Sequence, residues 1–117
     1  MQRHVYALDL ADDPTLIAEY EAWHRAGKIW PEVLDSLRPW GLHSLDIFRT
    51  GSRLVLIIEA PDDFSPEAKA EADAGNPAVQ AWERLMWTFQ RPLPWAKPGQ
   101  KWVPMEMIFS LTKVLGQ

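Results

Sequence analysis

The stretch Leu54-Val-Leu-Ile-Ile58 constrains the fold of this chain more than any other. It is short, wholly apolar and flanked by polar residues, which is typical of a β-strand within a sheet. Side chains along a strand alternate between the two faces of the sheet, so both faces are apolar here. Helices that pack on one face leave the other face in need of a cover. We expect a second copy of the chain to provide it, in a homodimer whose sheets pack against each other.

Four strands are expected in all. Thr50-Gly51-Ser52 is a glycine turn suited to a hairpin between two of them. Near the C-terminus, alternate residues form one wholly apolar face, although Pro104 places the start of that strand at an edge or a bulge. The expected strands are His4–Leu10, Leu42–Thr50, Arg53–Ala60 and Val103–Leu111.

Helix-start signals separate these strands. The acidic cap and proline of Asp13-Pro14 begin a helix that Gly27 interrupts and Pro31 restarts. Ser65-Pro66 and Asn76-Pro77 begin two more helices. The resulting β-α-β-β-α-β order predicts an α+β, ferredoxin-like fold with an antiparallel four-stranded sheet and helices on one face. We expect one domain over residues 1–117.

The segment Arg91–Gly99 carries too many prolines for regular structure. We expect it to form an extended arm or lid. Trp95 in this arm and the nearby Trp102 are candidates for contacts exchanged between two copies of the chain.

The composition excludes several classes of function. The chain has no cysteine, which excludes disulfides, thiolate catalysis and cysteine-ligated metals and is compatible with a cytoplasmic location. A formal net charge of −4 without a basic stripe argues against nucleic acid as a partner. No apolar run resembles a signal peptide or is long enough to cross a membrane. Seven tryptophans are unusual, and their flat faces suit the C–H faces of a sugar.

Two pairs of residues are candidates for chemistry. Tyr20 and His24 are four positions apart and share one helix face, so the imidazole can act as general acid or base beside a phenol that orients substrate. The alternative is a half-buried helix in which a neighbour satisfies the histidine. Trp82 and Glu83 combine an aromatic face with a carboxylate, a combination that holds sugars. Their alternative is a core tryptophan beside a solvated glutamate.

A metal site is not expected. His43 and Asp46 lie on opposite faces of a regular strand, so they cannot both line one pocket. A set formed by His24, His43 and a carboxylate lacks the spacing of known metal motifs.

Three segments together resemble the L-rhamnose mutarotase family. They are Glu19-Tyr20-x-x-x-His24, then Ile29-Trp30-Pro31-Glu32, and then Gln80-x-Trp82 with Met86, in the family's order and over nearly the whole chain. The resemblance implies a dimeric α/β barrel that interconverts the α and β anomers of a 6-deoxy-L-sugar without a cofactor. It implies His24 as proton donor and Tyr20 and Trp82 as sugar contacts; we add Trp30 and Glu83 as substrate-binding candidates.

This sequence departs from the family pattern at positions that contact sugar. Leu45 stands where the rhamnose enzymes carry a tyrosine, and Glu83 stands where they have a second tryptophan. The Arg-Ala-Gly-Lys connection after His24 is also two residues longer than the pattern. The arm Gln90–Gly99 and the acidic residues near the start, Asp9 and Asp12-Asp13, resemble the fucose-type branch. We therefore favour L-fucose over L-rhamnose.

Two other classes share such a fold: a cofactor-free dimeric α/β-barrel monooxygenase, and a non-catalytic small-molecule-binding protein. Neither is expected to combine Tyr20 and His24 with the Ile-Trp-Pro-Glu motif that contains Trp30.

Overall fold

The sheet is built around its first strand. In the computed structural model, which describes residues 1–116, β1 (Gln2–Leu10) pairs antiparallel along almost its whole length with β3 (Arg53–Ala60). The hairpin partner of β3 is β2 (Ser44–Thr50), and Gly51 at the turn has a φ of 55°, which a residue with a Cβ rarely adopts. Two short strands, β4 (Gln90–Arg91) and β5 (Val103–Pro104), pair with β1, and the main path runs β2-β3-β1-β4.

Helices follow the signals that the sequence predicted. The longer helices are α1 (Pro14–Trp23), α2 (Pro31–Leu37), α3 (Pro66–Ala74) and α4 (Pro77–Trp87), and each begins with a proline. The side chains of Asp13, Ser65 and Asn76 accept hydrogen bonds from backbone N–H groups in the first turns of α1, α3 and α4. The predicted interruption at Gly27, whose φ is 82°, separates α1 from α2. A short 3-10 helix, η1 (Arg38–Trp40), leads from α2 towards β2.

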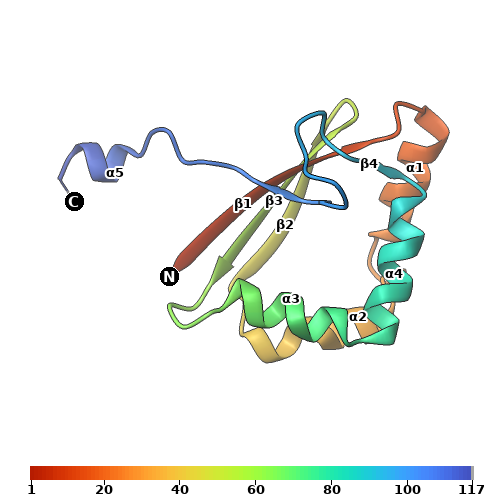
Figure 1. Ribbon diagram of the computed structural model, residues 1–117, viewed down its shortest axis with the longest axis horizontal. Helices are drawn as coiled ribbons and strands as arrows, with labels where there is room; N and C mark the ends of the chain where they lie inside the picture. Colours follow the sequence, from red (N-terminus) through yellow and green to blue (C-terminus); the bar gives the residue numbers. More distant parts are fainter. Residues whose placement is uncertain (117) are drawn as a thin grey trace.

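One face of the sheet forms the core. Leu8 of β1 lies opposite Leu54 of β3, and both side chains are fully buried. Helices α1 to α4 gather on this side of the curved sheet (Figure 1), where Tyr20, Trp82 and Met86 pack against Leu54. The α+β, ferredoxin-like fold class is therefore confirmed.

The other face carries apolar residues that the core does not use. Val55 and Ile57 of β3 point to it and remain partly exposed. The expectation that β3 carries apolar side chains on both faces of the sheet is confirmed.

The expected strand Val103–Leu111 is wrong in its extent. Only Val103–Pro104 forms β5, and the last backbone contact with β1 is the 2.8 Å hydrogen bond from Met105 N–H to the Val5 carbonyl. Beyond it the chain projects away from the sheet (Figure 1) and ends in α5 (Leu111–Val114). The reason is that alternation predicts which side chains share a face, whereas a strand also needs a neighbour for its backbone. The two-residue strand β4 and helix α5 were not predicted.

The two tryptophans expected in exchanged contacts differ. Trp95 is exposed, with the Arg53 guanidinium 5.5 Å from the centre of its ring. Trp102 is partly buried and packs against the apolar core of its own chain. Trp102 thus already has an intramolecular role.

Candidate active site

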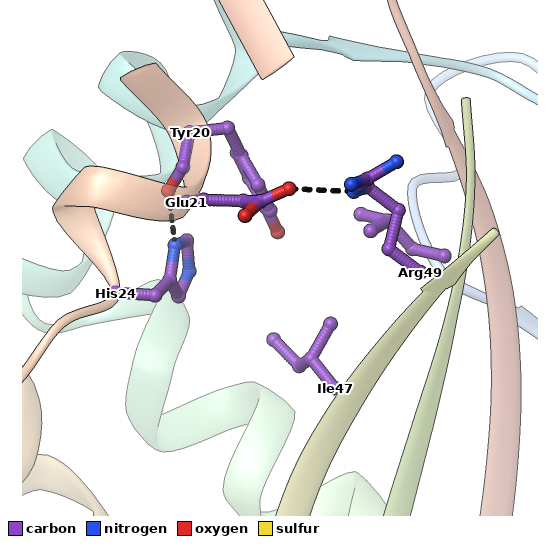
Figure 2. Close-up of a pocket in the computed structure, with 6 residues that line it drawn as sticks. Tyr20, Glu21, His24, Ile47 and Arg49 are labelled. Carbon is purple, nitrogen blue, oxygen red and sulfur yellow. Dashed lines mark hydrogen bonds and ion pairs between the residues drawn. The ribbon is translucent and has the colours of Figure 1, made fainter. Parts of the chain in front are cut away.

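The end of helix α1 brings Tyr20 and His24 together. Their rings are 4.4 Å apart between centroids, and His24 Nδ1 lies 2.7 Å from the Tyr20 carbonyl oxygen. A carbonyl can only accept, so Nδ1 carries a proton and donates it. The other ring nitrogen, Nε2, lies on the side of an open cavity (Figure 2). His24 is therefore held in one orientation, with a single nitrogen free to exchange protons.

The side chain of Tyr20 is buried at the edge of the core. Its oxygen accepts a 3.3 Å hydrogen bond from Gln90 Nε2. Burial raises the pKa of Tyr20 to about 12; the Gln90 hydrogen bond opposes this shift, and the charge of Glu83 adds to it. Tyr20 is therefore a neutral phenol near pH 7, able to donate a hydrogen bond but not to act as a base.

Gln90 is itself buried. Within the described residues its Oε1 atom has no hydrogen-bond partner. Sequence analysis did not single out this residue, because its role depends on β4, which brings it beside a side chain 70 positions earlier in the chain.

The predicted tryptophans lie on the core side of the histidine, with Trp82 next to its ring. Trp82 is only 7% exposed, and the rings of Trp23, His24 and Trp30 lie 6.2, 5.8 and 5.2 Å from it in edge-to-face geometry. Tyr20, His24, Trp30 and Trp82 thus form one aromatic cluster. Trp82 has little free face, so its packing holds the His24 ring in place, and stacking on a sugar stays a prediction.

Glu83 is paired rather than free. It forms an ion pair with Lys101, whose side chain is only 12% exposed, and Lys101 also donates to the Glu83 carbonyl at 3.3 Å. The Lys101 ammonium lies 4.7 Å from the centre of the Trp87 ring. This partner, 18 positions away, was not predicted from the sequence. A sugar hydroxyl bound by Glu83 would share the carboxylate with Lys101.

A cavity of about 310 Å³ opens between α1 and the helix-facing side of the sheet. Such a volume lies at the lower end of the usual range for small-molecule sites, about 300–1,000 Å³. Tyr20 and His24 were expected here, and the remaining lining residues were missed. The lining consists of Tyr20, Glu21, His24, Ile47, Arg49 and Leu54 (Figure 2). Alternation along β2 puts Ile47 and Arg49 on the face that Leu45 shares, which is the signal that could have revealed them.

The other candidates do not join this cavity. Asp46 lines a neighbouring cavity with Leu45, whereas His43 lies just before β2 and is exposed. Across residues 1–116 there is no group of three or more histidine, aspartate or glutamate side chains arranged to hold a metal ion. None of the helices in that range has the length and apolarity needed to cross a membrane.

Comparison with known proteins identifies the family. The sequence profile described as L-rhamnose mutarotase matches residues 3–111. The chain belongs to the L-rhamnose mutarotase family. It is 51% identical over 115 residues to an L-fucose mutarotase from Xanthomonas campestris pv. campestris, covering 98% of this chain and 92% of that protein. A UPF0734 protein from Dictyostelium discoideum is 32% identical over 112 residues, covering 92% of this chain and 88% of that protein.

Solved structures agree on the fold. An L-rhamnose mutarotase from Formosa agariphila superposes with a TM-score of 0.67 and 19% identity, covering 95% of this chain and 99% of that chain. The tetracenomycin F2 cyclase from Streptomyces glaucescens gives a TM-score of 0.62 with 18% identity, covering 96% of this chain and 98% of that chain. At these identities the likeness concerns the fold alone. The sequence-based assignment to the mutarotase family is confirmed by the profile and the relatives.

The Tyr20–Gln90 contact predicts a coupled effect on stability. Tyr20→Phe and Gln90→Leu each leave a buried polar group without its partner, so each should lower the free energy of unfolding by about 1–3 kcal/mol. The double substitution should cost clearly less than the sum of the two. Urea unfolding of the four proteins at pH 7 measures this coupling. Strictly additive losses would show that the hydrogen bond carries no energy.

The raised pKa of Tyr20 predicts a pH dependence. The folded-state pKa of about 12 exceeds the ordinary value of 10.0, so the unfolded chain loses the phenol proton first as the pH rises. The stability difference between wild type and Tyr20→Phe should be constant below about pH 9 and fall by about 1.4 kcal/mol at pH 11. Urea unfolding across this range tests it. A difference that stays constant up to pH 11 contradicts the buried phenol.

Proposed function

We propose that the protein is an aldose 1-epimerase, or mutarotase, that interconverts the α and β anomers of a 6-deoxy-L-sugar, with L-fucose preferred to L-rhamnose. The observation that carries the reaction type is His24, whose Nδ1 is bound to a carbonyl while Nε2 faces a cavity of monosaccharide scale. The L-fucose mutarotase that is 51% identical supports the choice of sugar. L-Fucose and L-rhamnose differ in configuration at C2 and C4, and Glu83 is the residue that we propose to distinguish them.

Anomer exchange needs two proton movements. The ring oxygen gains a proton as its bond to C1 breaks, and the anomeric hydroxyl loses one as C1 becomes an aldehyde. Rotation about C1–C2 and the reverse steps then close the ring on the other face, so no proton is consumed overall. We assign the proton at the ring oxygen to His24 Nε2, which the Nδ1 hydrogen bond leaves free in both protonation states. The chemistry requires no redox step and no covalent intermediate.

The remaining predicted residues have supporting roles in this proposal. Tyr20 is a neutral phenol near pH 7, and burial raises its pKa further, so it serves as a hydrogen-bond donor. Trp82 packs on the histidine ring and Trp30 packs on Trp82, so the two exclude water from the core side of the histidine. Glu83, held by Lys101, is the carboxylate that we propose for a sugar hydroxyl. The reaction is proposed to need no cofactor, and the cytoplasmic location stays a prediction.

His24→Ala should lower the rate of anomer exchange about 10²–10⁴-fold, the usual contribution of a general acid or base. Saturation-transfer NMR on L-fucose and L-rhamnose measures the exchange, and circular dichroism checks that the variant is folded. His43→Ala is the matched control, because His43 lies outside the cavity and is exposed. Exchange at the wild-type rate in a folded His24→Ala variant would refute the proton transfer.

We also propose a homodimer. The face of the sheet that carries Val55 and Ile57 is not covered by the helices, and the projecting segment Met105–Leu115 exposes many large apolar side chains. Ile108 in this segment is 93% exposed. A partner chain would cover both surfaces, with the segment extending over the partner's sheet.

The dimer predicts that one charge in the projecting segment disrupts assembly. Ile108→Asp should give a monomer at micromolar concentration, because the carboxylate would be buried without a partner in the interface. Thr15→Asp, at an exposed position on α1, is the control and should keep the wild-type mass. Light scattering coupled to size-exclusion chromatography reports the mass. A wild-type monomer at this concentration would overturn the proposal.

A further inference from the structure

An ion pair between helix α1 and strand β2 borders the cavity. Arg49 Nε of β2 donates to Glu21 Oε1 of α1 at 2.6 Å, and Arg49 Nη1 donates to the Gly51 carbonyl at 2.8 Å. Both side chains line the cavity, and Figure 2 shows Arg49 across it from the imidazole, with Glu21 reaching towards Arg49 from α1. The pair therefore places both a positive and a negative group beside the space that a sugar would occupy.

Stability alone is a weak reason for this pair. The side chains of Arg49 and Glu21 are 38% and 47% exposed, and ion pairs at such exposed positions contribute little to folding. Both groups also keep unused hydrogen-bonding capacity. A guanidinium has five N–H donors, of which these contacts take two, and the second carboxylate oxygen of Glu21 remains for a further donor.

The lining of the cavity combines the charged pair with apolar side chains. Ile47 and Leu54 supply apolar lining beside the charged pair. Sugar hydroxyls both donate and accept, so they suit a guanidinium next to a carboxylate, and hydrogen bonds to charged groups are the stronger kind. A methyl group at C6 would pack on the aliphatic side chains instead. Polar and apolar groups thus lie side by side, as the C4 hydroxyl and the neighbouring C5 methyl group of a 6-deoxy sugar require.

We propose that Arg49 and Glu21 bind the hydroxyls at the end of the pyranose remote from the anomeric carbon, and so help to choose the sugar. The inference rests on the proposed function, because His24 at the ring oxygen and C1 turns C3 and C4 towards the opposite side of the cavity. C4 is one of the two centres at which L-fucose and L-rhamnose differ. Arg49 donates to the C4 hydroxyl, and Glu21 accepts from it or from its neighbour at C3.

The test pairs a change in the protein with a change in the sugar. Arg49→Met should lower kcat/KM for L-fucose about 10–100-fold, mainly by raising KM, since a charged hydrogen bond to substrate is lost. For wild type, 4-deoxy-L-fucose should show a loss of similar size. The values of kcat/KM of Arg49→Met for L-fucose and 4-deoxy-L-fucose should agree within about twofold, because the variant lacks the group that binds the C4 hydroxyl. Glu21→Gln should show a smaller loss in the same direction.

Arg38→Met is the matched control. It breaks a similar exposed ion pair, with Arg38 Nε 3.0 Å from Asp35 Oδ1, at a place that does not line the cavity. It should leave the kinetic constants for both sugars unchanged. Arg49→Lys retains the charge and should recover part of the affinity.

Two outcomes would overturn the inference. One is unchanged KM for L-fucose in Arg49→Met; the other is an equal loss for L-fucose and its 4-deoxy analogue, which would mean that the side chain only supports the fold. Failure of the wild-type protein to exchange the anomers of any 6-deoxy-L-sugar is a different result. It would remove the proposed function itself.

Discussion

The pairing of β1 with β3 is the constraint on which the structure depends. Its register places Leu8 opposite Leu54 on the helix-facing side, where both are fully buried. A slip of one residue in either strand would turn the apolar set of that strand to the other face and leave the core without half of its centre. Leu54 also lines the cavity beside Arg49, so the same register sets the floor of the candidate site.

Burial divides the candidate residues into two groups. Tyr20, Trp82 and Gln90 belong to the core, where burial raises the pKa of the phenol and packing holds the aromatic rings. His24, at the C-terminal end of α1, keeps one ring nitrogen bound to the backbone and the other free. The proposed proton transfer requires that accessible nitrogen. The buried residues behind His24 hold its ring in the orientation that exposes this nitrogen.

Two apolar surfaces of the single chain point to a larger assembly. One is the sheet face that the helices leave bare, and the other is the segment after β5. The strand pattern in this segment has no partner strand among residues 1–116, since its ladder with β1 ends at Met105. The proposed homodimer would account for both features, because each chain would supply the cover that the other lacks.

Much of the architecture and the centre of the site could be predicted from the sequence by itself, because they depend on short-range signals. A proline after an acidic or polar cap begins a helix, and a glycine at positive φ ends a helix or forms a turn. A spacing of four residues puts Tyr20 and His24 on one helix face. Only the tertiary structure decided the partners: Gln90 for Tyr20, Lys101 for Glu83, and Arg49 for Glu21. These contacts join residues 70, 18 and 28 positions apart, so they exist only once the strands are in register and the helices lie on the sheet. The same holds for the end of β5, because alternation assigns side chains to faces, while a neighbouring backbone determines how far a strand extends.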